Sequence, residues 1–222
     1  MTPSLPAKWT LAATALLLAA APLSAHKLRE KGASVTVANS AMTVTPARDW
    51  NRLSGSPGKF AESWTLNGEQ LDDLTFYGGI KPGQPLVKER SKKRDPLPKF
   101  KKSTLLIEMP ELLEGTYRTY KTLGAFQLLS AEPAPFLGKD GVRFTYEYTD
   151  DDGLTRKGEA RAAIVDGQLY MATFDAPRLH YFDRSIEVLD RAIEVSLLHP
   201  RGASIRQYPG TPRVEFERTR EI

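Results

Sequence analysis

The sequence predicts an α+β domain in which an antiparallel β-sheet, built as a meander, packs against helices in an arrangement like an α/β/α sandwich. Residues 142–149 alternate apolar with polar side chains, as in a strand with one buried and one solvated face. Asp166 and Gly167 then favour a type I′ hairpin turn. Two stretches with helical spacing of apolar residues, 110–123 and 184–197, supply the layers that cover the sheet.

The start of the 222-residue chain has the pattern of an export signal. Lys8 precedes an apolar run, 11–21, which is too short to cross a bilayer comfortably, and small residues follow up to Ala25. We therefore expect residues 1–25 to be a signal peptide that is cut after Ala25, with an uncleaved membrane anchor as the alternative. Residues 26–33 are charged and predict a flexible leader.

The composition limits the cellular compartment of the protein and the classes of catalytic or metal site that it can contain. The chain has no cysteine, which excludes thiolate catalysis, Cys-ligated zinc, iron–sulfur clusters and acylation of an N-terminal cysteine. Together with the export signal, this predicts the periplasm of a Gram-negative bacterium, or secretion, for a domain large enough to be stable without disulfides. The formal net charge of +4 is too small an excess to predict nucleic-acid binding.

The first part of the domain predicts short strands separated by turns. Alternating apolar residues indicate the strands, and clusters of Gly, Pro and Asn indicate the turns. The predicted strands are 35–37, 42–45, 59–66 and 71–76, with a turn at 39–40 and a loop at 48–58. We interpret Tyr77, Gly78 and Gly79 as a bend that closes the last of these strands.

Residues 81–103 predict a long surface loop, because they combine several prolines with a dense run of Lys and Arg. Compact domains rarely carry a loop of this length without a function. Its charge favours contact with anionic lipid headgroups, an acidic protein or a cell-wall polyanion, with a solvated, disordered loop as the alternative. The candidate binding residues are Lys88, Arg90, Lys92, Lys93, Arg94, Lys99, Phe100, Lys101 and Lys102, with Phe100 as an apolar anchor.

The remaining elements follow in order. Pro110 starts the helix 110–123, and Gly124 ends it as a C-cap. Strands are predicted at 125–131, 142–149, 154–165 and 168–174. Asp183 is a favourable N-cap for the helix 184–197, and residues 201–222 predict a tail. We therefore expect residues 34–200 to form a single domain.

No residue pattern predicts a catalytic, metal or cofactor site. The chain has no P-loop, no nucleophile elbow and no zinc-protease motif. His26 would begin the mature chain, but a copper brace needs a second histidine facing it. The consecutive carboxylates of Asp150, Asp151 and Asp152 lack the spacing of a calcium loop and predict a solvated turn.

Aromatic residues are interpreted mainly as packing groups. Trp50 and Trp64 are expected in the core or at its rim. Tyr181 and Phe182 are expected to pack under the start of the second helix, although Arg178, His180 and Tyr181 could instead line a cleft.

The predicted order of strand hairpin, strand pair, helix, meander and C-terminal helix resembles the PsbP-like α/β/α sandwich. The likeness is strongest in residues 167–193, GQLYMATFDAPRLHYFDRSIEVLDRAI, and the basic loop lies outside the pattern. The chain also looks like small exported proteobacterial proteins of unknown function. Members of the fold mostly act as binding or assembly factors, so the resemblance implies a non-enzymatic role.

We accordingly expect an exported, non-enzymatic binding or assembly factor for a protein or cell-envelope component. The alternatives are a periplasmic small-molecule or lipid carrier, with a groove between sheet and helices, and an unrecognised enzyme. We expect no cofactor, no nucleic-acid partner, and no transmembrane segment once the signal has been cleaved.

Overall fold

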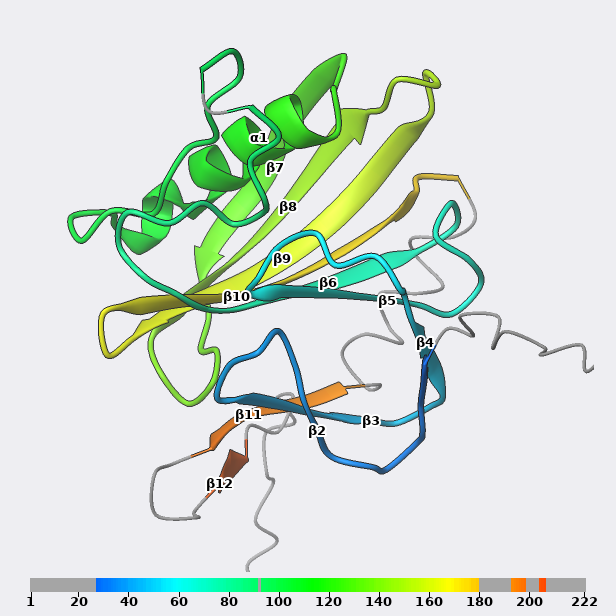
Figure 1. Cartoon of the computed structure of the whole chain (residues 1–222), viewed down its shortest axis with the longest axis vertical. Coiled ribbons are helices and arrows are strands. Elements are labelled where there is room, and N and C mark those ends of the chain that lie inside the picture. Colours follow the sequence, from blue (N-terminus) through cyan, green and yellow to red (C-terminus); the bar gives the residue numbers. More distant parts are fainter. Residues whose placement is uncertain (1–26, 92, 180–192, 199–203, 207–222) are drawn as a thin grey trace, which may run out of the picture.

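A computed structural model describes residues 27–91, 93–179, 193–198 and 204–206 of the chain. A large antiparallel sheet forms the middle layer, with α1 (Met109–Tyr120) on one face and a small sheet on the other (Figure 1). A single 3₁₀ turn, η1 (Leu106–Glu108), leads into α1. This described part is mostly antiparallel β-sheet, which agrees with the predicted α+β class.

The large sheet has eight strands in the order β1-β4-β5-β6-β10-β9-β8-β7. Its strands are β1 (Lys27–Arg29), β4 (Trp50–Arg52), β5 (Ala61–Thr65), β6 (Asp73–Ile80), β7 (Ala125–Pro133), β8 (Gly141–Thr149), β9 (Thr155–Val165) and β10 (Gln168–Pro177). The small sheet has the order β12-β11-β3-β2. Its strands are β2 (Val35–Thr36), β3 (Met42–Pro46), β11 (Ile193–Leu198) and β12 (Ser204–Arg206).

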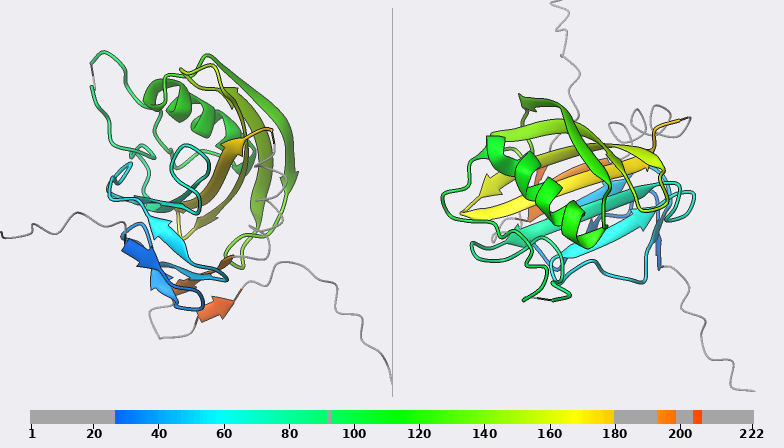
Figure 2. Two further views of the ribbon diagram at one scale, coloured as in Figure 1. Left: turned by 90° about the vertical axis from the view of Figure 1, so that its right-hand side faces the viewer. Right: turned by 90° about the horizontal axis from the view of Figure 1, so that it is seen from above.

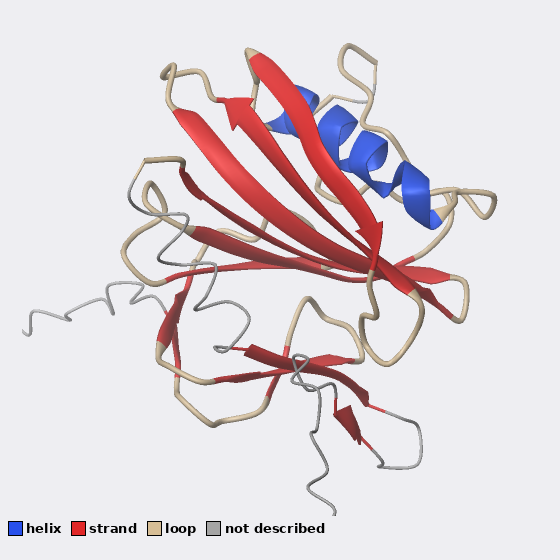
Figure 3. Cartoon of the chain, turned by 180° about the vertical axis from the view of Figure 1, so that it is seen from behind, coloured by secondary structure: helices blue, strands red, loops and turns tan. Residues whose placement is uncertain are grey.

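The two faces of the large sheet contribute to two separate hydrophobic cores. In β10, Leu169 and Met171 pack in the core beneath α1, whereas Tyr170 and Phe174 pack in the core shared with β3. This separation follows from the strand period of two, which sends successive side chains to opposite faces. Figures 2 and 3 show α1 lying across one face of the large sheet, with the small sheet behind the other.

The meander predicted from local patterns is confirmed. Strands β7 to β10 are adjacent in sequence order, and β8 alternates buried and partly exposed residues along its length. Asp166 and Gly167 adopt φ values of 51° and 74°, as the predicted type I′ turn requires. The predicted strands 35–37 and 42–45 pair as β2 and β3, as expected.

The predicted second helix is wrong in its last turn. Residues 180–192 lie outside the described part, but Ile193–Leu198 is a strand that pairs with β3, with Val195 opposite Val44. The alternating apolar residues of this segment fit a strand as well as a helix, and a partner about 150 positions away is invisible to local periodicity. The described layers are therefore helix, sheet and sheet rather than an α/β/α sandwich.

The predicted flexible leader contains an edge strand. Lys27–Arg29 pairs with β4, which itself lies inside the segment 48–58 that the sequence predicts as a loop. Arg29 forms an ion pair with the buried carboxylate of Glu62 on β5. A buried carboxylate needs such a partner, so Arg29 is held by pairing, while Lys27, Glu30 and Lys31 of the leader are exposed.

The predicted bend at Tyr77, Gly78 and Gly79 is instead a bulge inside β6. Leu169 of β10 pairs with Ile80 and Met171 pairs with Tyr77, so the two glycines oppose a single residue. Gly79 has φ of 68°, and a Cβ on Gly78 would lie 2.1 Å from the Ser40 hydroxyl oxygen. Gly78 is therefore required by the close approach of Ser40, and Gly79 by its left-handed backbone. Neither glycine ends the strand.

The predicted helix 110–123 is confirmed, but it ends earlier than its glycine suggested. Lys121 is the C-cap, and Thr122 takes the left-handed conformation with φ of 57°. Gly124 instead donates its backbone N–H to Thr149 and leads into β7.

The predicted signal peptide, 1–25, lies outside the described residues, as does most of the predicted tail, of which residues 204–206 form β12. In the part of the chain that the structure describes, no helix has the length and apolar character needed to cross a membrane.

Candidate functional site

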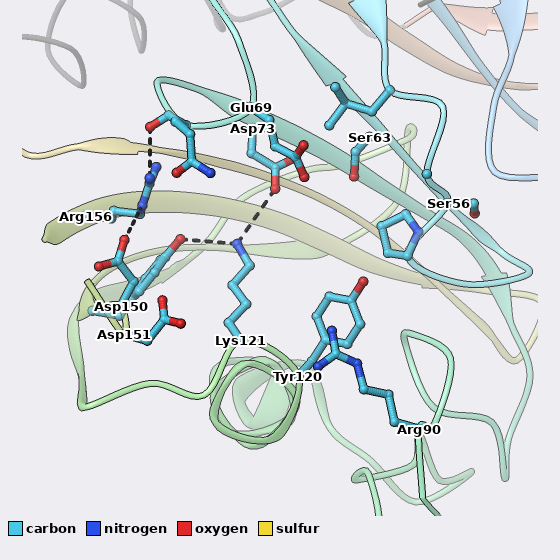
Figure 4. Close-up of a pocket in the computed structure, with 15 residues that line it drawn as sticks. Ser56, Ser63, Glu69, Asp73, Arg90, Tyr120, Lys121, Asp150, Asp151 and Arg156 are labelled. Atoms are coloured by element: carbon cyan, nitrogen blue, oxygen red, sulfur yellow. Dashed lines mark hydrogen bonds and ion pairs between the residues drawn. The ribbon is translucent and has the colours of Figure 1, made fainter. Parts of the chain in front are cut away.

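A cleft of about 530 Å³ lies where the C-terminal end of α1 meets the polar end of the large sheet (Figure 4). Its walls come from the loops that join β4 to β5 and β5 to β6, from the basic loop, and from the connection between β8 and β9. Cavities of this size hold small molecules in other proteins. We refer to it as the Lys121 cleft, after the residue at its floor.

Lys121 extends its ammonium group into a cage of carboxylates and aromatic rings. The Nζ atom lies 3.5 Å from Asp175 Oδ2 and 3.7 Å from Asp73 Oδ2, and it donates to the Tyr148 hydroxyl at 3.2 Å. It also lies 4.3 Å and 5.2 Å from the ring centroids of Tyr117 and Tyr148, within cation–π range. The side chain is 24% exposed, so the ammonium is held by the protein while still bordering the cleft.

Local sequence rules account for the positions of Lys121 and Asp175 in this cage. Lys121 follows Tyr117 by four residues, which puts the two side chains on the same face of the helix end. Asp175 lies an even number of positions after Leu169 and Met171 in the same strand, so the three side chains lie on the same face of the sheet. The carboxylate therefore points toward α1 rather than toward the small sheet. The cage therefore occupies the polar end of an otherwise apolar face.

Asp175 is fully buried and held by two tyrosines. The hydroxyls of Tyr117 and Tyr146 donate to its carboxylate at 2.6 Å and 2.9 Å. Gly158 on β9 leaves the room for this arrangement, because a Cβ there would lie 2.4 Å from the Tyr146 ring and 2.6 Å from Asp175 Oδ1. The hydrogen bonds and the ion pair with Lys121 offset the cost of burying the charge.

The protonation equilibria of the cage follow from its burial. Burial raises the pKa of Asp175, although Lys121 and the two tyrosine hydroxyls oppose the shift. Burial alone would lower the pKa of Lys121, but Tyr148 and the carboxylates raise it well above its usual value. Burial, reinforced by Asp175, raises the pKa of Tyr117 and Tyr146. The lysine is therefore a cation and these tyrosines are neutral at neutral pH.

This combination suits binding better than acid–base chemistry. A general base or nucleophile needs a pKa near the working pH and contact with the substrate. Lys121 stays protonated, and the carboxylate of Asp175 is sealed beneath Tyr117 and Tyr146. The cage thus supplies fixed charges and dipoles at the floor of the cleft.

The walls of the cleft carry a second ion pair and three charges without a partner. Arg156 donates to Asp150 at 2.9 Å and to the Gln70 carbonyl at 2.8 Å. In the part of the chain that the structure describes, three other lining residues have no ion-pair partner, namely Arg90, Glu69 and Asp151. The Arg90 guanidinium instead stacks over Tyr120, 5.1 Å from the ring centroid.

The basic loop is fixed to the domain by its apolar residues. Phe100, predicted to anchor a partner, is 1% exposed and packs with Leu86 and Leu97 in the core beneath α1, which leaves it no surface for a partner. Backbone bonds from Gly83 N–H to the Phe100 carbonyl and from Phe100 N–H to the Gln84 carbonyl close the base of the loop.

The structure leaves the cations of this loop on the surface. Seven of the predicted binding residues are exposed, and none of them forms an ion pair with a carboxylate among the described residues. They are Lys88, Arg90, Lys93, Arg94, Lys99, Lys101 and Lys102. Lys92 lies outside the described residues. Only Arg90 of this set also lines the Lys121 cleft.

Two large apolar side chains follow the basic loop and are also exposed. Leu105 is 62% and Ile107 is 65% exposed, just before α1. The sequence alone does not predict their exposure, because an apolar stretch is expected to be buried. Their position a few residues after Lys101 and Lys102 was the available signal.

Of the other sequence candidates, Arg178 lines a second cleft of about 390 Å³ with Leu154 and Leu179, and the rest form no site in the described residues. The carboxylates of Asp150, Asp151 and Asp152 lie within 4.8 Å of one another, but Asp150 already pairs with Arg156 and accepts the Leu154 N–H in a turn. Trp50 and Trp64 are buried in the core, as predicted. The histidines at 26, 180 and 199 and the aromatics at 181 and 182 lie outside the described part.

Comparisons with known proteins give little beyond the fold. No family model matches the sequence, and no curated protein matches it. Among solved structures, the chain is similar to cyanobacterial PsbP from Synechocystis, with a TM-score of 0.44 and 14% sequence identity over 79% of this chain and 92% of that chain. The similarity concerns the fold, and no argument about residues, ligands or partners rests on it.

Proposed function

We propose that this chain is an exported, non-enzymatic binding module that docks on an anionic membrane surface of the cell envelope through its basic loop. The observation that carries the proposal is the row of seven exposed cations without carboxylate partners among the described residues. Each Lys or Arg near an anionic leaflet contributes about 1 kcal/mol to binding. Glu89 and Asp95 are the only acidic residues within residues 88–102, so the loop keeps a strong net positive charge.

The exposed apolar pair beside the loop favours a lipid surface over an acidic protein or a polysaccharide. Leu105 and Ile107 come three and five residues after Lys102 and are more than half exposed. Interfacial binding combines apolar side chains that enter the headgroup boundary with cations that face anionic lipids. A purely electrostatic partner would gain nothing from these two side chains.

The anchoring of the loop makes this surface ready to bind. Phe100 and Leu97 hold the loop in the core beneath α1, on the face of the large sheet opposite the small sheet (Figure 1). Ordering a surface on binding costs conformational entropy, and a loop that is already fixed avoids part of that cost.

The carrier and enzyme alternatives receive less support. The Lys121 cleft is lined by several ionised groups, which disfavours an apolar or lipid cargo. It does bring polar groups with shifted pKa values together, as an active site would. However, the pKa of Lys121 is raised away from neutrality, and Asp175, whose pKa is raised, is fully buried.

Export itself is part of the proposal and has its own test. The intact mass of the protein recovered from the periplasm or medium is expected to correspond to a chain that begins at His26. A mass that includes residues 1–25 would contradict cleavage after Ala25.

Docking is tested by sedimentation with vesicles of phosphatidylglycerol and phosphatidylcholine, compared with vesicles of phosphatidylcholine alone. We expect binding to the anionic vesicles only, weakening as salt is raised. The double variant K93E/R94E is expected to bind about tenfold more weakly or worse, because two attractive charges become repulsive.

The matched control changes the net charge by the same amount elsewhere. Lys31 and Arg48 are exposed residues next to β2 and β3, on the side of the small sheet. K31E/R48E should therefore bind anionic vesicles nearly as well as the unmodified protein. The proposal fails if the unmodified protein does not sediment with anionic vesicles, or if both double variants lose the same share of vesicle binding.

A further inference from the structure

The Lys121 cleft carries separated charges that the protein itself does not neutralise. Lys121 pairs with both Asp73 and Asp175, two carboxylates for one ammonium, and Arg156 pairs with Asp150. What remains on the walls is one unpaired guanidinium, that of Arg90, and two unpaired carboxylates, those of Glu69 and Asp151, among the described lining residues.

These remaining charges of opposite sign are spread along the cleft. Figure 4 places Arg90 with Tyr120 at one end, Lys121 between, and Asp151 with the Asp150–Arg156 pair at the other. A ligand with a single charge would satisfy one end and leave the other unmatched. Electrostatic complementarity instead requires a ligand with an anionic and a cationic end.

We propose that the Lys121 cleft binds short peptides with free termini. The terminal carboxylate pairs with the Arg90 guanidinium, which is suited to bidentate recognition of a carboxylate. The terminal ammonium lies toward Asp151. The peptide chain crosses the floor above Lys121 and Tyr148.

The size and composition of the cleft agree with a dipeptide or tripeptide. Its volume of about 530 Å³ lies within the usual range for small-molecule sites. The cage of Lys121, Asp175 and Tyr146 fixes the floor, so binding needs little rearrangement of the protein.

The other ligand classes fit the charges less well. A lone phosphate or carboxylate would face Glu69, Asp73 and Asp151 as well as Arg90. A polyamine would find the aromatic cage between Tyr117 and Tyr148 already filled by the ammonium of Lys121.

The test screens a library of unblocked dipeptides by ligand-observed NMR and titrates the strongest binder by calorimetry. The same peptide is then titrated with its amino end acetylated, and separately with its carboxylate amidated. We expect each modification to weaken binding about tenfold, because each removes one charge-assisted contact.

Variants of the protein test which residue binds the carboxylate end of the peptide and which binds the ammonium end. R90Q should weaken binding of the free peptide to the level of its amide, and amidation should then have no further effect. D151N should behave in the same way toward acetylation. R118Q is the control, because Arg118 is an exposed arginine of α1 that does not line the cleft, and it should bind the free peptide normally.

Two results would overturn the inference. One is that no unblocked dipeptide binds; the other is that blocked peptides bind as tightly as free ones. Neither result bears on docking to anionic vesicles, which is tested with K93E/R94E and is measured without peptide.

Discussion

Asp175, Tyr117 and Tyr146 show how a single glycine can permit a buried polar cluster. The Asp175 carboxylate and the Tyr146 ring occupy the space where residue 158 would carry a Cβ. The two tyrosine hydroxyls supply the hydrogen bonds that a buried carboxylate requires. Gly158 therefore matters for the absence of its side chain rather than for its backbone conformation.

Replacing Gly158 by alanine is expected to lower the free energy of unfolding by about 1–3 kcal/mol, as overpacked cores do. The reason is the 2.4 Å approach of the new Cβ to the Tyr146 ring. Urea denaturation measures the change. Gly55→Ala is the control, since no atom lies within 4 Å of a Cβ placed there, and an equal loss in both variants would contradict the packing argument.

The same tyrosines predict a loss of stability in alkali. Their pKa values are raised in the folded protein above the usual value of 10.0, so the folded state holds these protons more tightly than the unfolded chain does. Their stabilising contribution is complete below about pH 10 and is lost as the pH rises through the folded-state pKa. Lys121, whose pKa is also raised, adds to the loss in the same direction.

We therefore expect the free energy of unfolding, measured in urea at a series of pH values, to fall steeply above about pH 10. Tyr146→Phe removes one of the titrating groups and should make the decline shallower. A flat profile up to pH 11, or an unchanged slope in the variant, would contradict the assignment.

At the scale of elements, residues 81–103 combine an exposed charged surface with a buried foundation. The composition of the loop predicts an unstructured segment, because prolines and cations dominate it. Yet Leu86, Leu97 and Phe100 are all buried. A few apolar residues spaced along a polar segment are enough to fix it when the core has room for them.

Replacing Phe100 by alanine should cost about 3–5 kcal/mol of unfolding free energy, the usual range for a buried phenylalanine. It should also weaken vesicle binding, although no charge changes, because the cations are no longer held together. Denaturation and sedimentation measure the two effects. Lys101→Ala, at the next and exposed position, should leave the unfolding free energy within about 0.5 kcal/mol of the original; a Phe100→Ala protein as stable as this control would contradict the anchoring.

The elements that sequence predicts well are those made by neighbours in the chain. Strands β7 to β10 and the turn at Asp166 follow from local alternation and turn chemistry. The need for glycine at position 78 in the β6 bulge, by contrast, comes from Ser40, and β11 depends on its pairing with β3. These contacts join distant segments, so no local pattern reports them.

The Lys121 cleft illustrates the same limit for function. Its cage unites α1, β6, β8 and β10, which sequence reasoning treated separately. One local signal was present: Asp175 stands at a core-facing position of an apolar strand, where a carboxylate is costly without partners. The cations at residues 88–102 were identified from composition alone, whereas Leu105 and Ile107 gained meaning only from their exposure.

For the whole molecule, the layers separate two roles. The small sheet and the large sheet enclose one core, while α1, η1 and the basic loop cover the other face and carry both the proposed docking surface and the cleft. A protein docked through this face would hold the cleft near the membrane. The central claim is therefore that this face, and not another, meets the lipid.

A fluorescent label at a single position tests that claim most directly, because the chain has no cysteine of its own. Leu105→Cys and Leu28→Cys each carry an environment-sensitive dye, Leu28 being an exposed residue of β1 at the far edge of the large sheet. On addition of phosphatidylglycerol vesicles, the emission at position 105 should shift to the blue and become shielded from an aqueous quencher, while that at position 28 should not change. An unchanged signal at 105, or the same shift at both positions, would contradict the account.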